Sequence, residues 1–343
     1  MKVLFSYWGF TEPFDKCHRA NTPDGGRFTR PIFVDKLVEN GHTVISLQKR
    51  REKYPYKNLI YDDKGFPDGD ILFIEWRWPI YKNSGKGKFE PDLERQTELL
   101  KHYHGEIPVV IWDADLKMTE EDEKRWPEAI IADPTLDPKK ITRDRVRLPF
   151  SSDFKVIMDP YFEPIRYGYI GNNYERDEMF MKYYNTPAAG LRVKGIQTSV
   201  YGNWLLKSPE RMSPEEVVKK FKYVSFVDRV GFTESMKLLN SFICSTHISK
   251  PEYADVGFAS PRYLENIATC TPALVPEEFK YKNILGKFWV VKDGVDVIKK
   301  TLMIKAMTPN ERLNVVNAQA QELIEEYPDF KVETTVSLLE SLV

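Results

Sequence analysis

The chain has 343 residues, of which 42% are apolar and 13% aromatic, and its formal net charge is −1. This length exceeds a single ordinary hydrophobic core and predicts two domains, while the composition excludes a disordered chain. The near-zero charge argues against a protein that coats nucleic acid non-specifically, although it is compatible with a local basic face. Three widely spaced cysteines, Cys17, Cys244 and Cys270, predict neither a disulfide framework nor a zinc site and favour a reducing cytosol.

The first half of the chain alternates strand-like and helix-like segments. Its first nine residues are too short and too aromatic for a signal peptide, and the chain has no run of about 18 apolar residues, so we expect no membrane span. A short apolar strand is followed by a helical pattern that Gly41 ends, and the next strand begins at once, which is typical of a parallel α/β sheet. We predict strands at residues 3–7, 42–47, 70–75, 107–112, 129–132 and 154–158, and helices at 32–39 and 93–103.

The same alternation restarts after a proline-rich hinge at residues 159–164. We predict strands at 166–170, after Gly195, and at 223–227, 242–245 and 272–275, with helices at 175–184, 213–222, 233–240, 261–270, 293–307 and 310–327. The expected domains span residues 1–160 and 165–325, and a C-terminal helix in 326–343 would pack back on the first domain. The expected fold class is α/β, with two Rossmann-like domains that face a central cleft. Ligands bind at the carboxyl ends of strands in such sheets, which would place the site in that cleft.

Two motifs in the second half suggest a nucleotide diphosphate site. The strand at 166–170 runs into a small turn that contains Gly171 and Asn172, and Arg176 lies at the start of the next helix. Turn amides and a helix N-terminus can bind a diphosphate. Further on, Arg262 and Glu265 are three residues apart on a predicted helix end, where Arg suits a phosphate and Glu can accept from both ribose hydroxyls. The alternatives are an ordinary strand-to-helix turn and a surface ion pair.

The stretch from 224 to 279 resembles the donor-binding region of GT-B glycosyltransferases, above all the β-glucosyltransferases of T-even phages, which modify hydroxymethylcytosine in DNA. The likeness lies in the order of a Phe-Val strand, a helix, an apolar strand, the Arg262-x-x-Glu265-x-x-Ala268 motif and the segment 273–279. It implies that Arg262 holds the diphosphate, Glu265 holds the ribose, and the Gly171 turn is the phosphate loop. This chain departs from the family at Tyr174, where a second arginine is expected. The family's second active-site acid has no clear match among residues 24–27.

The first half resembles the family more loosely. The strand that ends at Asp113 matches the strand whose terminal aspartate is the family's catalytic base, and Asp115 is the second candidate. The alternative for Asp113 is an acid that caps the next segment. The family carries a Gly/Lys loop on its DNA side. Here aromatic and basic residues follow the strand at 70–75, and we expect DNA contacts from Trp76, Arg77, Trp78, Lys82, Lys86 and Lys88. Basic clusters at 48–53, 82–88 and 139–147 would add to this face.

The resemblance implies transfer of a sugar from a UDP-sugar donor to a base hydroxyl, by a single displacement that inverts the anomeric carbon. The sugar is glucose or a pentose such as arabinose, and the acceptor is a 5-hydroxymethylcytosine-like base, extruded from double-stranded phage DNA. We expect a monomer in the cytoplasm of a phage-infected bacterium. No metal motif is present, although the diphosphate could bring Mg²⁺. The alternatives are a GT-B enzyme with a saccharide, lipid or small-molecule acceptor, a non-enzymatic nucleotide-binding protein, and a phosphorylase or epimerase.

Overall fold

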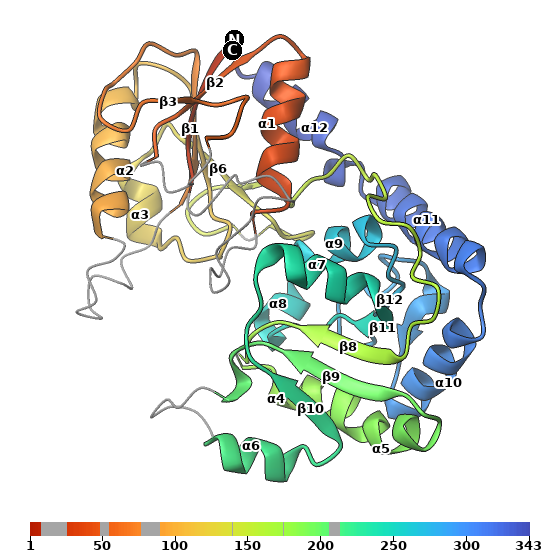
Figure 1. Cartoon of the computed structure of the whole chain (residues 1–343). Coiled ribbons are helices and arrows are strands. Elements are labelled where there is room, and N and C mark those ends of the chain that lie inside the picture. The colour runs from red at the N-terminus through yellow and green to blue at the C-terminus, as the bar shows by residue number, and fades with distance from the viewer. Residues whose placement is uncertain (8–25, 49–54, 77–89, 139, 174, 206–212) are drawn as a thin grey trace. The chain divides into compact units, whose positions relative to one another are not determined.

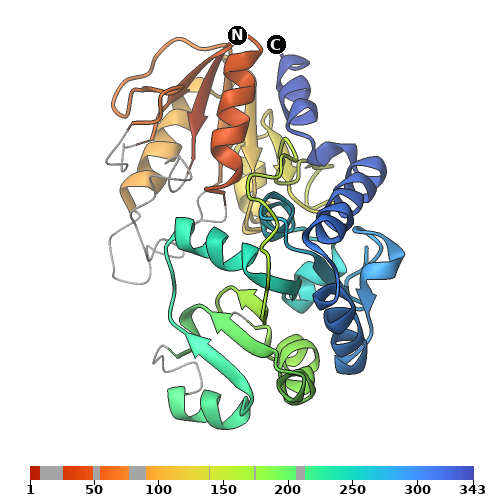
Figure 2. The ribbon, with the colours of Figure 1, turned by 45° about the vertical axis from the view of Figure 1, so that its right-hand side comes forward.

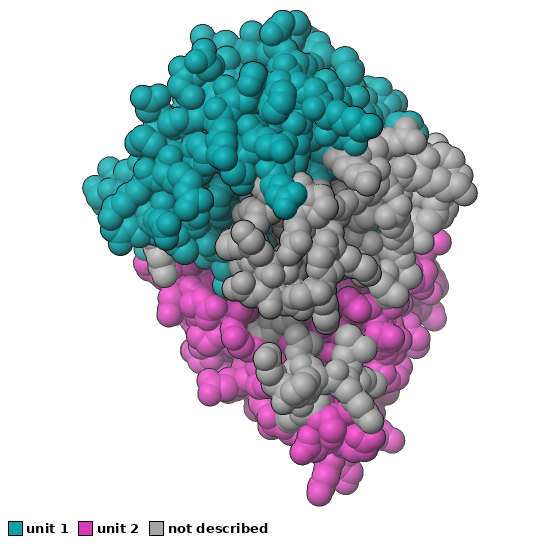
Figure 3. Space-filling view, turned by 90° about the vertical axis from the view of Figure 1, so that its left-hand side faces the viewer, with its two compact units in different colours: residues 1–13, 24–153, 329–343 teal, residues 14–23, 154–328 magenta. Residues whose placement is uncertain are grey.

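The computed structural model describes the backbone of residues 1–7, 26–48, 55–76, 90–138, 140–173, 175–205 and 213–343 (Figure 1). The chain divides into two compact units, which Figure 3 shows in different colours. Unit 1 contains the described part of residues 1–153 together with Asp329–Val343, and unit 2 contains residues 154–328. Each unit is built on its own parallel sheet with flanking helices.

The sheet of unit 1 has seven parallel strands in the order β3-β2-β1-β4-β5-β6-β7. Apart from the exposed Lys2 at the start of β1, the central strands are mainly apolar and buried along their length, as expected where helices cover both faces. Phe5 on β1 is in register with Phe73 on β4, and both rings contact Phe33 of the first helix. The strands are β1 (Lys2–Ser6), β2 (Thr43–Ser46), β3 (Ile60–Tyr61), β4 (Ile71–Glu75), β5 (Val109–Trp112), β6 (Ile130–Asp133) and β7 (Val146–Arg147).

The C-terminal helix α12 (Val332–Glu340) belongs to unit 1 and packs beside α1 (Thr29–Glu39) (Figures 1 and 2). Lys36 on α1 pairs with Glu333 on α12 at 3.0 Å, and His42 lies 2.7 Å from Glu340. The other helices of this unit are α2 (Glu90–Tyr103) and α3 (Glu120–Arg125), the latter begun by a Thr119 capping box.

The sheet of unit 2 has six parallel strands in the order β10-β9-β8-β11-β12-β13, and α5 packs on α10 (Figure 1). Its strands are β8 (Arg166–Ile170), β9 (Gln197–Tyr201), β10 (Val224–Val227), β11 (Phe242–Thr246), β12 (Ala273–Pro276) and β13 (Val290–Val291). Its helices are α4 (Asp177–Phe180), the π-helical turn Met181–Asn185, α5 (Thr186–Val193), α6 (Pro214–Lys220), α7 (Phe232–Asn240), α8 (Pro251–Asp255), α9 (Arg262–Ala268), α10 (Gly294–Lys305) and α11 (Pro309–Glu326). No helix in the described part of the chain is long and apolar enough to cross a bilayer.

Several predicted elements differ in the structure. The helices predicted at 32–39 and 93–103 begin three residues earlier, at Thr29 and Glu90. The strand predicted at residues 154–158 is wrong, because this segment joins neither sheet and Ile157 there is 47% exposed. The helix predicted at 175–184 begins two residues later, since Glu175 has a φ of +50°, outside the helical region. That helix then continues through the π-helical turn into α5, and the strand predicted after Gly195 is β9.

Candidate functional site

The carboxyl ends of β8 and β9 in unit 2 are joined by a reciprocal pair of asparagines. The side-chain oxygen of Asn172, in the turn after β8, accepts a hydrogen bond from the backbone N–H of Asn203 at 3.1 Å. The side-chain oxygen of Asn203, in the turn after β9, accepts one from the N–H of Asn173 at 3.3 Å. Because parallel strands end at the same sheet edge, these two turns form one platform where ligands bind in such folds.

Gly202 is the second device that brings these turns together. A β-carbon at this position would lie 2.2 Å from the carbonyl oxygen of Gly171, so only glycine fits. The same carbonyl accepts a hydrogen bond from the indole N–H of Trp204 at 2.9 Å. Sequence analysis missed the segment 202–204, although its Gly-Asn pair after a strand repeats the Gly171–Asn172 pattern. The Gly171 amide itself donates to the carbonyl of Tyr201 at 2.9 Å and is therefore not available to a phosphate.

Arg176 folds back over the same turn. It occupies the position just before α4, and its guanidinium donates to the carbonyl oxygen of Asn172 at 2.8 Å. Its cationic head is thereby fixed beside the predicted phosphate loop. A guanidinium in this place can bind a phosphate by paired hydrogen bonds.

Arg262 and Glu265 form an ion pair on α9. The alternative interpretation of this motif was a surface ion pair, but this pair does not lie at the surface. The Glu265 side chain is only 6% exposed, whereas that of Arg262 is 25% exposed. Burial raises the pKa of Glu265 above its usual value, and Arg262 opposes that rise. The helix begins at Arg262 with Pro261 as its N-cap, and the Ser260 hydroxyl accepts from the Arg262 amide at 3.3 Å. The pair holds a buried carboxylate beside a solvent-accessible cation.

His247 lies in the same place and was not found by sequence analysis. It follows β11, its Nε2 is 3.1 Å from the Ser260 hydroxyl, and its ring centroid lies 3.6 Å from that of Tyr263. Burial holds the pKa of His247 well below its usual value, and the positive charges of Arg262 and Arg176 lower it further. Both arginines are therefore near one neutral imidazole. Two guanidinium groups, this imidazole and the Glu265 carboxylate match what a nucleoside diphosphate needs.

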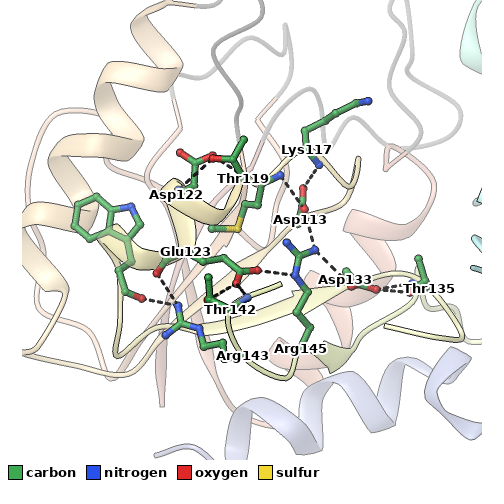
Figure 4. Close-up of polar contacts among 12 residues, drawn as sticks. Asp113, Lys117, Thr119, Asp122, Glu123, Asp133, Thr135, Thr142, Arg143 and Arg145 are labelled. Carbon is green, nitrogen blue, oxygen red and sulfur yellow. Dashed lines mark hydrogen bonds and ion pairs between the residues drawn. The ribbon is translucent and has the colours of Figure 1, made fainter. Parts of the chain in front are cut away.

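In unit 1, Asp113 follows β5 and its carboxylate is almost completely buried (Figure 4). Its Oδ1 accepts from the Lys117 amide at 2.7 Å, and its Oδ2 accepts from the Met118 amide at 2.9 Å and from Arg145 at 3.0 Å. Burial raises the pKa of Asp113, while the two amides and Arg145 oppose the rise. The second candidate, Asp115, is exposed in the same loop. Asp113 thus caps the loop that follows it, which was the alternative interpretation of this residue. Its raised pKa also makes the carboxylate a better proton acceptor.

Arg145 is a buried hub among three carboxylates (Figure 4). Besides Asp113, it contacts Glu123 through Nε at 2.8 Å and Asp133 at 3.5 Å. Burial acts to raise the pKa of Glu123, but hydrogen bonds from Thr142 and Arg145 outweigh it and lower the pKa. This cluster was not predicted from the sequence, because its members come from four separate segments.

The three arginines of the basic stretch at 139–147 all contact polar groups of unit 1. Arg143 donates to the carbonyl oxygens of Glu123 and Trp126, Arg145 is buried, and Arg147 pairs with Asp329. Arg145 is therefore out of reach of DNA phosphates, whereas the side chain of Arg147 is still 37% exposed. Trp76 is buried, with 8% of its surface exposed. The other expected DNA contacts, Arg77, Trp78, Lys82, Lys86 and Lys88, lie outside the described residues.

Unit 1 also contains a small cavity at the carboxyl end of β4. Its polar wall is a buried ion pair, in which Arg30 donates to both oxygens of Glu75 at 2.7 and 2.8 Å. Its volume of about 30 Å³ has room for one or two water molecules. Its aromatic walls are Phe5, Phe33, Phe73, Trp112 and Phe150. Within the described ranges, no three His, Cys, Asp or Glu side chains are grouped to hold a metal ion.

The fold is similar to solved structures along nearly the whole chain. A structure of the DNA-modifying enzyme β-glucosyltransferase, studied with and without uridine diphosphoglucose, has a TM-score of 0.64 at 13% identity, and the match covers 100% of this chain and 99% of that one. The T4 phage β-glucosyltransferase with UDP and Mn²⁺ has a TM-score of 0.63 at 12% identity, over 96% and 99%. Sucrose-phosphate synthase from Thermosynechococcus elongatus has a TM-score of 0.53 at 12% identity, over 99% and 97%.

No protein-family model and no curated protein matches the sequence. At these identities the structural matches establish the fold, which is of the GT-B type with two Rossmann-like domains. The fold-level resemblance that the sequence indicated is thereby confirmed.

Proposed function

We propose that this protein is a glycosyltransferase that moves a sugar from a UDP-sugar to the hydroxyl of a modified cytosine in double-stranded DNA. One observation carries the donor half of this proposal: Arg176, His247 and the Arg262–Glu265 pair gather at the carboxyl ends of β8 and β11. Fold alone does not define an activity, so the proposal depends on what these side chains can bind.

The donor's diphosphate would be held by Arg262 and Arg176. Arg262 has a quarter of its side chain exposed and can turn from Glu265 to a phosphate oxygen. Glu265 would then accept from the ribose hydroxyls, which replaces its lost ion pair with new hydrogen bonds. The neutral imidazole of His247 fits the same site, because it can form a hydrogen bond with the donor without adding a third positive charge to those of Arg262 and Arg176. A divalent ion would be held mainly by the diphosphate, in line with the complex of T4 phage β-glucosyltransferase with UDP and Mn²⁺.

Asp113 is the proposed general base. The acceptor hydroxyl gives its proton to Asp113 as its oxygen bonds to the anomeric carbon, and UDP leaves from the opposite face, so the configuration inverts. A carboxylate oxygen has two lone pairs, and the described contact at Oδ1 uses one of them. The raised pKa of Asp113 also suits a base that must take up a proton near neutral pH. Arg262 and Arg176 would stabilise the charge that develops on the leaving diphosphate.

DNA is proposed as the acceptor because the matched β-glucosyltransferase is named a DNA-modifying enzyme. A GT-B enzyme with a saccharide acceptor is the second candidate, favoured by the similarity to sucrose-phosphate synthase and by the net charge of −1. The two differ in their salt dependence, because contacts with DNA phosphates weaken steeply as salt rises. The cytoplasm of a phage-infected bacterium would be the site of the DNA reaction.

The test is to incubate the protein with a panel of UDP-sugars and duplex DNA that carries 5-hydroxymethylcytosine. Nucleoside mass spectrometry then reads whether a hexose or a pentose is added. We expect transfer to the modified DNA, none to a duplex of the same sequence with plain cytosine, and none by Asp113→Asn, which should still bind UDP. Transfer to a free saccharide, with no product on DNA, would favour the second candidate. UDP binding without any transfer would leave a nucleotide-binding protein.

A further inference from the structure

We propose that Arg145 is a positioning residue that governs the protonation of Asp113 by dividing one guanidinium among three buried carboxylates. The inference rests on the proposed role of Asp113 as the base. It starts from a charge count: Asp113, Glu123 and Asp133 surround a single cation, and the side chains of all four residues are at most 2% exposed. If all three acids are ionised, the cluster carries two uncompensated negative charges.

The three acids do not share Arg145 equally. Glu123 receives the Nε–H at 2.8 Å and two further hydrogen bonds from Thr142, at 2.9 and 2.6 Å. Asp133 receives two from Thr135, at 3.0 and 2.5 Å, and lies 3.5 Å from the guanidinium. Each of these two acids therefore has hydrogen-bond donors besides Arg145.

Asp113 is the acid of this cluster that we expect to take up a proton first. Two backbone amides and one shared N–H group of Arg145 stabilise its ionised form, while burial opposes it. We infer that the charges of the two neighbouring acids oppose it as well, because like charges disfavour the ionised form. The charged groups around it come from α3, the end of β6, the segment before β7 and its own loop, namely Glu123, Asp133, Arg145, Asp115 and Lys117. Proton uptake by Asp113 reduces the surplus from two charges to one. Like charges at one site raise the pKa of the group that protonates first.

This arrangement gives Arg145 two opposing effects on catalysis. Its cation keeps Asp113 ionised and ready to accept a proton. Its engagement by Glu123 and Asp133 limits that stabilisation, so Asp113 stays basic enough to take the proton from the acceptor hydroxyl. Removing a competing acid should therefore weaken the base and lower its pKa. Removing Arg145 should do the opposite.

The experiment compares pH profiles of kcat/KM for transfer to hydroxymethylcytosine DNA. Glu123→Gln and Asp133→Asn keep the shape and one of the two acceptor oxygens but remove one negative charge each. We expect the acid limb of both profiles to move to lower pH by about 0.5–1 unit, since a close charge shifts a pKa by about that much or more. Arg145→Gln, if it folds, should move the limb to higher pH. Glu120→Gln is the matched control, because Glu120 lies on the same helix with a side chain 62% exposed.

A second readout does not need turnover. The ¹³C carboxyl signal of Asp113, assigned by its loss in Asp113→Asn, should titrate at lower pH in Glu123→Gln than in the native protein. The inference would be overturned if sugar is transferred but the acid limbs and the carboxyl titrations are the same in Glu123→Gln, Asp133→Asn and the control Glu120→Gln. The proposed function would then still stand. Native protein that transfers no sugar at any pH would contradict the proposed function, and the carboxyl titration would still decide the role of Arg145.

Discussion

Gly202 and Gly171 meet so closely that the turns after β8 and β9 behave as one structural element. The α-carbon of Gly202 leaves space for a hydrogen only, because a methyl group there would lie 2.2 Å from the Gly171 carbonyl oxygen. The Asn172–Asn203 hydrogen bond joins the same two turns from the side. The shape of the proposed phosphate loop therefore depends on a residue thirty-one positions further along the chain.

Gly202→Ala should separate these turns and weaken UDP binding. Overpacking at a rigid contact costs about 1–3 kcal/mol, so we expect a loss of that order in the free energy of unfolding. Calorimetric titration with UDP and urea unfolding measure the two effects. Gly195→Ala is the control: Gly195 also has a positive φ, +73°, but its missing β-carbon would meet open space. That variant should lose about 1 kcal/mol of stability and bind UDP normally. Equal UDP affinity in both variants would refute the coupling.

Glu265→Gln should reduce UDP affinity by about 10- to 100-fold, because a hydrogen bond to a charged group contributes about 1.5–3 kcal/mol. The loss should be absent for a ligand without ribose hydroxyls, such as inorganic pyrophosphate. Calorimetry with both ligands provides the comparison. Glu234→Gln, an exposed glutamate on α7 in the same unit, serves as the control. If UDP and pyrophosphate lost affinity equally, Glu265 would not be the ribose ligand.

His247 should make the protein less stable in mild acid. Its pKa is depressed in the folded state, so the unfolded chain binds a proton more readily once the pH falls below about 6.5. Stability that is present above that pH is then lost at up to about 1.4 kcal/mol per pH unit. Urea unfolding between pH 5 and 8 should show a smaller decline in His247→Gln than in the native protein. His102→Gln, which changes an exposed histidine, should follow the native curve.

Breaking the Arg30–Glu75 pair should lower the stability strongly, whereas replacing both residues by apolar ones should lower it only slightly. Glu75→Gln leaves a buried guanidinium without its anion and should cost about 3–5 kcal/mol of stability. The double variant Arg30→Met with Glu75→Leu removes both charges, and we expect it to recover most of that loss. Urea unfolding of the single and double variants measures this. A double variant no more stable than Glu75→Gln would mean that the pair is needed for the fold itself.

The fold was largely predictable from the sequence, because buried parallel strands are short apolar runs between glycine or proline signals. Gly41 ends α1 and β2 begins two residues later, as expected. The segment 154–158 has apolar residues like those of a strand, but it joins neither sheet because no neighbouring strand pairs with it. Whether a partner strand exists is a property of the tertiary structure, which a local pattern does not contain.

The candidate site was predictable only where its residues are close in sequence. The spacing of Arg262 and Glu265 on one helix face is a local signal, whereas the placement of His247 against Ser260 and near Arg262 depends on how β11 and α9 pack. Arg145 was misread for the same reason. A sequence shows that a stretch is basic, but it does not show that its arginine points inward toward acids from three other segments.

Helix α12 gives the chain an interlaced order, since unit 1 is completed by residues that follow unit 2 along the chain. During synthesis the first 153 residues would emerge with the side of α1 that packs on α12 still exposed to solvent. That side could be covered only after all of unit 2 had been made. Dissection at the hinge would thus yield an N-terminal fragment with an unsealed apolar side. Separate expression of that fragment would require α12 to be grafted on or supplied as a peptide.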